Sequence, residues 1–108
     1  MEYKAIYRYA RISPQKVRVF ADLVRGKTAD VALSELRFHP NRGARFLEEV
    51  IRSAMANAEE QGETKIRLLE VVDVRVDCGP MFRRMKPKSR GMSAIIKKRM
   101  AHISVTLG

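Results

Sequence analysis

Hydrophobic and polar residues alternate in three stretches of the chain, which is the pattern of strands that bury one face. The first stretch spans residues 3–9, with Tyr3, Ala5, Tyr7 and Tyr9 on one side and Lys4, Ile6 and Arg8 on the other. The second runs from Leu69 to Asp77 and the third from Ile95 to Leu107. The inward residues expected in these two are Val72, Val74 and Val76, and then Ile103, Val105 and Leu107.

Three other stretches repeat their apolar residues every three or four positions, which predicts amphipathic helices. They span residues 13–26, 28–39 and 42–61. Ser13 and Thr28 are expected as N-caps, and Gly26 as a left-handed C-terminal cap. The apolar stripes are Val17, Phe20, Ala21 and Val24; then Ala29, Ala32, Leu33 and Leu36; and finally Leu47, Val50, Ile51, Ala54, Met55 and Ala58.

Between the last two strands, residues 79–94 show neither a helical stripe nor enough apolar residues for a core. Glycines and prolines interrupt this stretch, so the simplest interpretation is a long hairpin that projects beyond the body. At roughly 3.3 Å per residue, arms of about 11 residues would extend on the order of 35 Å. The predicted fold class is α+β, with three helices packed on a small three-stranded antiparallel sheet and one protruding β-hairpin. A single domain, 1–108, would consist of a body (1–78 and 102–108) and the hairpin (79–101).

Charge is distributed unevenly along this chain of 108 residues. Its 22 Lys and Arg outnumber 12 Asp and Glu, for a net charge of +10. Residues 1–27 carry seven basic and two acidic residues, residues 28–77 seven and ten, and residues 78–108 eight and none. A solubilising charge would be spread over the whole surface. This segregation therefore favours a directed contact with a polyanion.

Several functional classes find no support in the residues. Cys78 is the only cysteine, so neither a disulfide framework nor a cysteine zinc site is expected. Gly26-Lys27-Thr28 resembles the end of a phosphate-binding loop, but Ala21 stands where that motif requires glycine. His39 and His102 belong to no recognisable catalytic set. No apolar run is long enough to cross a membrane, and no signal sequence is visible. We therefore expect a cytoplasmic protein that is not an enzyme and has no cofactor or metal.

The acid-free basic stretch near the C-terminus is the strongest functional signal. A merely solvated charge run is the ordinary alternative. Two features disfavour it: no acidic residue interrupts the stretch, and a free two-stranded ribbon carrying like charges is marginal in water. We therefore expect the hairpin to become ordered when a polyanion surrounds it. The basic residues are Arg83, Arg84, Lys86, Lys88, Arg90, Lys97, Lys98 and Arg99.

Several motifs make the chain resemble the bacterial-type family of ribosomal protein twenty-two of the large subunit. They are Arg11-Ile12-Ser13-Pro14-Gln15-Lys16-Val17-Arg18, Asp22-Leu23-Val24-Arg25-Gly26-Lys27, Ala56-Asn57-Ala58, Val76-Asp77-Cys78-Gly79-Pro80 and His102-Ile103-Ser104-Val105. Lys88, Met92 and Cys78 depart from the family pattern. The resemblance implies a body on the outer surface of the large subunit. It also implies a hairpin that threads between segments of large-subunit ribosomal RNA and lines the nascent-peptide exit tunnel.

The expected function is to organise converging RNA segments and to line the exit tunnel. Expected partners are large-subunit rRNA, neighbouring large-subunit ribosomal proteins and, transiently, the nascent polypeptide, with no membrane partner. A free-standing nucleic-acid-binding regulator is the alternative. Besides the basic hairpin residues, the expected rRNA contacts in the body are Arg8, Arg11, Lys16, Arg18, Arg25, Lys27 and His102. The resemblance implies a tunnel-facing tip formed by Lys86, Pro87, Lys88, Ser89, Arg90, Gly91 and Met92.

Overall fold

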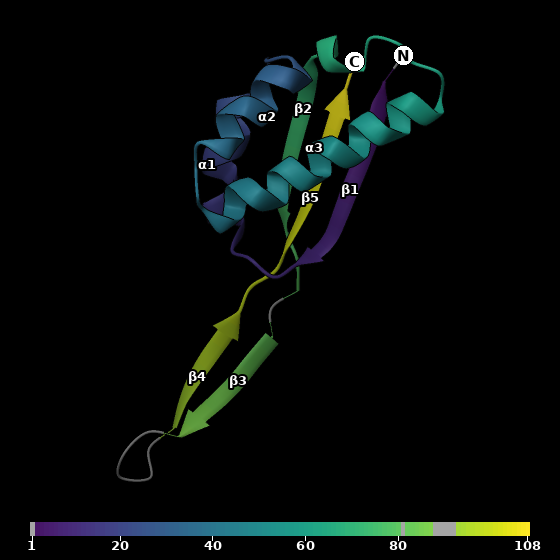
Figure 1. Ribbon diagram of the computed structural model, residues 1–108. Helices are drawn as coiled ribbons and strands as arrows, with labels where there is room; N and C mark the ends of the chain where they lie inside the picture. Colours follow the sequence, from purple (N-terminus) through teal and green to yellow (C-terminus); the bar gives the residue numbers. More distant parts are fainter. Residues whose placement is uncertain (1, 81, 88–92) are drawn as a thin grey trace.

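A computed structural model describes residues 2–80, 82–87 and 93–108 (Figure 1). The chain begins with strand β1 (Tyr3–Ala10) and continues through helices α1 (Pro14–Val24), α2 (Ala29–Arg37) and α3 (Arg42–Glu60). A single 3-10 turn, η1 (Ile66–Leu68), leads into β2 (Val71–Cys78). The strands β3 (Phe82–Pro87), β4 (Ser93–Lys98) and β5 (Ala101–Leu107) complete the chain.

The body is a three-stranded antiparallel sheet in the order β1-β5-β2, and the helices lie on one face of it (Figure 1). The central strand β5 contributes Ile103, Val105 and Leu107 to the core, all fully buried. The apolar stripes of the three helices meet them there, with Leu33 and Met55 only partly buried at the edge of the core. The predicted α+β class and the three helices on a small sheet are therefore confirmed.

The strands β3 and β4 form a separate two-stranded antiparallel sheet beyond the end of the body (Figure 1). The molecule measures 63 × 25 × 17 Å along its principal axes, so the long axis exceeds twice either of the others. One prediction was wrong in detail, because residues 95–107 do not form one continuous strand. β4 ends at Lys98 and β5 begins at Ala101, so the ribbon and the body are distinct sheets.

The alternation predicted for residues 69–77 was also wrong at one position. The pairing of β2 with β5 shifts register between Val71 and Asp73. Val71 is therefore fully buried, whereas Val72 is 47% exposed. Val74 and Val76 face the core as expected. An irregularity of this kind reverses which side of the strand a residue faces, and the sequence alternation does not reveal where it falls.

The helix caps lie at the predicted positions, but the two N-cap side chains do not make the hydrogen bonds expected of them. Ser13 and Thr28 occupy the N-cap positions with extended backbone, yet neither side chain makes a capping hydrogen bond. Gly26 follows α1 with φ +86°, in the left-handed region where glycine is favoured. The amide of Gly26 donates to the carbonyl of Val71, so this turn also attaches the end of α1 to the outer edge of β2.

Candidate nucleic-acid interface

The backbone register of the β3–β4 ribbon places basic residues opposite one another. Arg83 pairs with Lys97, whereas the other basic residues of the ribbon lie opposite uncharged ones, as Arg84 does opposite Ile96 and Lys86 opposite Ala94. Residues directly opposite in an antiparallel ladder share a face of the sheet, with Cβ atoms about 5 Å apart, and like charges there are destabilising. The predicted contacts at Lys88 and Arg90, and the tip residues Ser89, Gly91 and Met92, lie outside the described residues.

The ribbon is joined to the body by two closely packed connections. The amide of Gly79 donates a hydrogen bond to the carbonyl oxygen of Met100 at 2.8 Å. A Cβ atom at Gly79 would lie 3.1–3.2 Å from the Cβ, carbonyl carbon and carbonyl oxygen of Met100, tighter than ordinary contact. Glycine at this position therefore allows the two chains to approach where the ribbon begins. Arg99 is exposed beside this junction.

Three of the predicted body contacts carry guanidinium or ammonium groups exposed to solvent. Arg8 lies on β1, Arg11 lies between β1 and α1, and Lys16 lies in the first turns of α1. Within the described part of the chain, none of the three forms an ion pair or a side-chain hydrogen bond. Their charges are available to an external anion.

Arg18 and Arg25 are partly engaged within the protein. The Nε and Nη2 atoms of Arg18 both donate to the carbonyl oxygen of Val76, at 3.2 and 2.9 Å. The Nη2 atom of Arg25 donates to the carbonyl oxygen of Val74 at 2.7 Å, and its Nη1 pairs with Asp22 at 2.8 Å. These two side chains thus cover carbonyl groups along the outer edge of β2. A guanidinium has five N–H donors, so each keeps some for a further acceptor.

Lys27 differs from the other basic residues predicted to bind RNA. It is half-buried, and its Nζ atom pairs with the Glu35 carboxylate on α2 at 2.5 Å. Its carbonyl oxygen accepts a hydrogen bond from the amide of Val71. The charge of Lys27 is therefore already matched by an acid, unlike those of Arg8, Arg11 and Lys16.

His102 lies on β5, half-buried, beside an irregularity in β1. Its Nδ1 atom accepts a hydrogen bond from the Tyr9 amide at 3.0 Å. The two rings meet edge to face, with centroids 4.9 Å apart and planes at 88°. Only Nε2 is left for an external contact. The alternation of residues 3–9 places Tyr9 on the same side as Tyr3 and gives no sign of the irregularity, yet Tyr3 is buried and Tyr9 is exposed.

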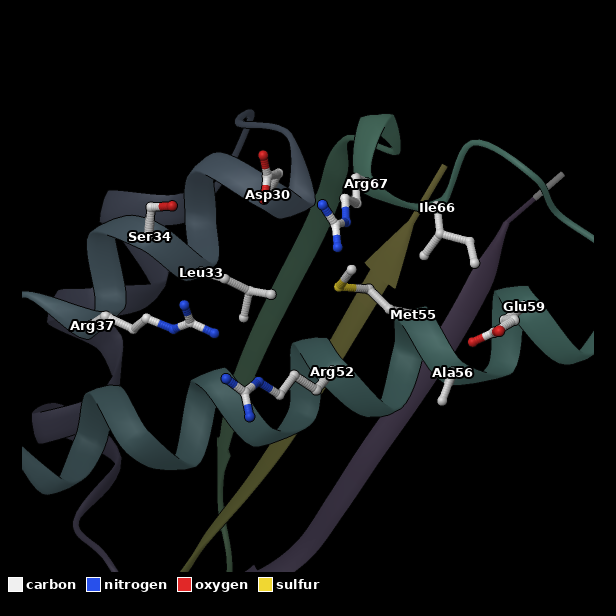
Figure 2. Close-up of a pocket in the computed structure, with 10 residues that line it drawn as sticks. All are labelled: Asp30, Leu33, Ser34, Arg37, Arg52, Met55, Ala56, Glu59, Ile66 and Arg67. Atoms are coloured by element: carbon white, nitrogen blue, oxygen red, sulfur yellow. The ribbon is translucent and has the colours of Figure 1, made fainter.

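A groove of about 510 Å³ opens between α2, α3 and η1, away from the predicted contacts. Figure 2 shows the side chains of Leu33, Arg37, Arg52, Met55 and Arg67 directed toward this space. Asp30 and Glu59 also line it, so its charges are mixed. The neighbouring Glu48 carboxylate accepts from Arg52 at 2.7 Å and from Arg37 at 3.5 Å. This groove lacks the unbalanced positive charge expected of a polyanion site.

A shifted pair of titratable groups lies near the N-terminus. The Tyr3 hydroxyl donates to the Glu63 carboxylate at 3.3 Å. Burial raises the pKa of Tyr3, and the Glu63 charge adds to this rise. The backbone amide of Lys65, which donates to Glu63, lowers the pKa of Glu63. This pair links β1 to the segment after α3, at the end of the body opposite the ribbon (Figure 1).

Among residues 2–80, 82–87 and 93–108, no three His, Cys, Asp or Glu side chains come together as a metal site would require. No helix in the same part of the chain is long and apolar enough to span a membrane.

The sequence model of the ribosomal protein L22p/L17e family matches residues 5–108. The chain belongs to this family. Large ribosomal subunit protein uL22 of Rhodopirellula baltica is 51% identical to it over 111 residues, covering 98% of this chain and 93% of that protein. The uL22 protein of Thermus thermophilus is 48% identical over 108 residues, covering 100% and 96%. The uL22 protein of Caldicellulosiruptor saccharolyticus is 44% identical over 103 residues, covering 95% and 84%.

Membership of the L22p/L17e family confirms the resemblance expected from the motifs. The chain is therefore a ribosomal protein with a structural role, and not an enzyme. The alternative of a free-standing regulator loses its basis, because the family match extends over the body and the ribbon alike.

Proposed function

We propose that the chain is a structural component of the large ribosomal subunit that binds rRNA through two basic regions of one domain. Its relatives are named as proteins of that subunit. Large-subunit rRNA and neighbouring ribosomal proteins are accordingly its partners, at the cytoplasmic ribosome. One region is the body, residues 1–78 and 102–108, and the other is the hairpin, residues 79–101.

The observation that carries this proposal is the pairing of Arg83 with Lys97 in a ribbon whose segment, residues 78–108, contains no acid. Like charges directly opposite one another in a ladder repel, and more strongly where water is displaced. No acidic residue of the ribbon offsets this repulsion. Phosphate groups on either side would remove it and would supply acceptors for both side chains.

The mechanism is neutralisation of phosphates that converge from different RNA segments. Contacts to phosphates fix position and orientation, and they carry no base sequence. Specificity then depends on the shape of the folded RNA around an extended ribbon. On the body, Arg8, Arg11 and Lys16 are the principal anchors, because their charges are unmatched within the described residues. Arg18, Arg25 and Lys27 contribute with the groups that their internal contacts leave available, and His102 contributes by holding the Tyr9 amide through Nδ1.

The far end of the hairpin is proposed to reach the nascent-peptide exit tunnel. Two observations support this: family membership, and the projection of β3 and β4 beyond the body (Figure 1). Residues 86–92 would form the surface that faces the nascent polypeptide. Because this segment mixes basic, small and apolar side chains, we expect it to bind a passing nascent polypeptide only weakly.

The test is the salt dependence of binding to deproteinised large-subunit rRNA. Log affinity should fall linearly with log salt, in proportion to the number of phosphates neutralised. The double variant Arg83→Gln/Lys97→Gln removes one cross-strand pair. It should lower the steepness of this line by about 1.5, since each phosphate contact contributes roughly 0.7–0.9.

The matched control is Lys65→Gln/Arg67→Gln, which removes the same two charges from exposed residues around η1. This control should leave the salt dependence within error of the original protein. Equal effects of the two double variants would mean that only net charge matters, and a nearly flat line for the unmodified protein would reject RNA binding through phosphates.

A further inference from the structure

The last residues of β1 contain a bulge. Tyr7 pairs with Ile103 and Ala10 pairs with Ala101, so Arg8 and Tyr9 together lie opposite the single residue His102. Tyr9 has φ 59°, and it is the one residue other than glycine with positive φ in the described part of the chain. Bulges bend a strand and redirect a side chain, and they are over-represented beside functional sites.

Tyrosine is a poor choice for this backbone conformation. Steric contact of Cβ with the backbone disfavours the left-handed region for bulky residues, whereas glycine and asparagine tolerate it. Burial does not explain the choice, because Tyr9 remains 59% exposed. Glycine or asparagine could form the bulge at lower free energy. An unfavourable conformation that presents an exposed ring is a reason to look for a use of that ring.

His102 holds the bulge in place. Its Nδ1 atom accepts the Tyr9 amide hydrogen, and its ring meets the Tyr9 ring edge to face. Such a contact covers at most one face of the Tyr9 ring, so the other face remains available for stacking.

Basic residues flank Tyr9 along the chain and in the neighbouring strand connection. Arg8 and Arg11 are exposed on either side of it in the chain. Arg99 is exposed two residues before Ala101, which pairs with Ala10. The nearest acid in the ladder is Asp77, which lies opposite His102 on the other side of β5. An aromatic ring among cations is the combination that proteins use for unpaired nucleotides, with the ring for the base and the cations for the phosphates.

We propose that Tyr9 stacks on an unpaired nucleobase of the rRNA where the ribbon leaves the body, and that Arg8, Arg11 and Arg99 neutralise the adjacent phosphates. His102 is then a positioning residue that fixes the bulge through Nδ1. This inference rests on the proposed RNA-binding function and adds a base contact to it. A duplex would not serve as the ligand, because its bases are already stacked and paired.

The first test compares Tyr9→Phe with Tyr9→Gly in binding to deproteinised large-subunit rRNA at one fixed salt concentration. Phenylalanine keeps the ring and should bind within about twofold of the original protein, because stacking needs only the ring face. Glycine removes the ring and should weaken binding roughly tenfold or more, given the usual effect of losing one stacked base. Since glycine accepts positive φ, the thermal midpoint of Tyr9→Gly should be unchanged or raised.

Tyr9→Asn is the second variant, because asparagine also tolerates the left-handed conformation and lacks a ring. It should weaken binding as Tyr9→Gly does. If both variants bind as the original protein does while its salt dependence stays steep, the inference at Tyr9 is wrong and the proposed function stands. A flat salt dependence of the original protein would reject the proposed function itself.

The role of His102 is tested by His102→Asn and His102→Leu. The asparagine Oδ1 atom can take the place of Nδ1 as the acceptor, so His102→Asn should retain the original affinity. His102→Leu removes the acceptor and should weaken binding about as much as Tyr9→Gly. The double variant His102→Leu/Tyr9→Gly should be no weaker than Tyr9→Gly, because both changes remove the same contact. Full additivity would overturn this assignment, since His102 would then contact RNA independently.

Discussion

The guanidinium groups of Arg18 and Arg25 show how a residue predicted to bind RNA can also support the fold. Their charges suggested an RNA contact, and the structure places both over carbonyls of β2, those of Val76 and Val74. An edge strand presents unpaired carbonyl groups, and covering them limits unwanted pairing with other chains. Sequence reasoning found the charges because they lie off the apolar stripe of α1. Their internal partners do not show in the local pattern, because Val76 is 58 residues from Arg18 and Val74 is 49 residues from Arg25.

Replacing Arg18 should therefore affect stability and RNA binding together, whereas replacing Lys16 should affect binding alone. In Arg18→Ala, the Val76 carbonyl loses both of its side-chain donors, which should cost about 0.5–1.5 kcal/mol of unfolding free energy. Lys16→Ala removes an exposed charge from the same helix and should stay within about 0.5 kcal/mol. Urea unfolding measures the difference. Equal unfolding free energies for the two variants would show that the bonds to Val76 contribute nothing to stability.

The elements of the body were largely predictable, and the exceptions share one cause. The three helices follow from stripes with helical spacing, which local sequence determines, and all three stripes face the core, with only Leu33 and Met55 partly exposed. The irregularities at Tyr9 and Val72 depend on how β1 and β2 pair with β5, which is far away in the sequence. Long-range pairing also explains why the predicted strand 95–107 is interrupted between Lys98 and Ala101, because β4 pairs with β3 and β5 pairs with β1 and β2. Alternation predicts that a strand exists, and long-range pairing decides its register.

The packing of α1 on α3 depends on Gly43, which is buried in the first turn of α3. A Cβ atom there would lie 2.6 Å from the carbonyl oxygen of Lys16, which belongs to the backbone of α1 and cannot rotate away. Gly43→Ala should therefore force the two helices apart. Overpacking typically costs about 1–3 kcal/mol, against a gain of at most about 1 kcal/mol from the better helix propensity of alanine.

Chemical denaturation of Gly43→Ala tests this expectation, with Ser53→Ala on the same helix as the control. Ser53 is exposed, and its hydroxyl donates to the Glu49 carbonyl in the preceding turn. Ser53→Ala should stay within about 0.5 kcal/mol of the original protein. An increase in stability for Gly43→Ala would contradict the close approach of the two helices.

Considered as a whole, the molecule keeps its acidic residues mostly in the middle of the chain and its excess positive charge toward the two ends. Residues 28–77, which supply α2, α3 and β2, hold seven basic and ten acidic residues, and the ion pair between Arg37 and Glu48 joins α2 to α3. The excess positive charge lies in residues 1–27 and 78–108. The elongated shape, 63 Å in its longest dimension, keeps the ribbon away from the acids of the body. We therefore expect the hydrophobic core to form without RNA and the ribbon to become ordered when RNA surrounds it.

Hydrogen exchange at the amides of β3 and β4 tests this dependence most directly. In the free protein, we predict that residues 82–87 and 93–98 exchange fast, since a two-stranded ribbon with opposed positive charges has little to stabilise it. The amides of β5 in the body should be strongly protected in the same sample. After incorporation into the large subunit, exchange in β3 and β4 should slow by orders of magnitude. Protection of the free ribbon equal to that of β5 would contradict the claim that RNA orders it.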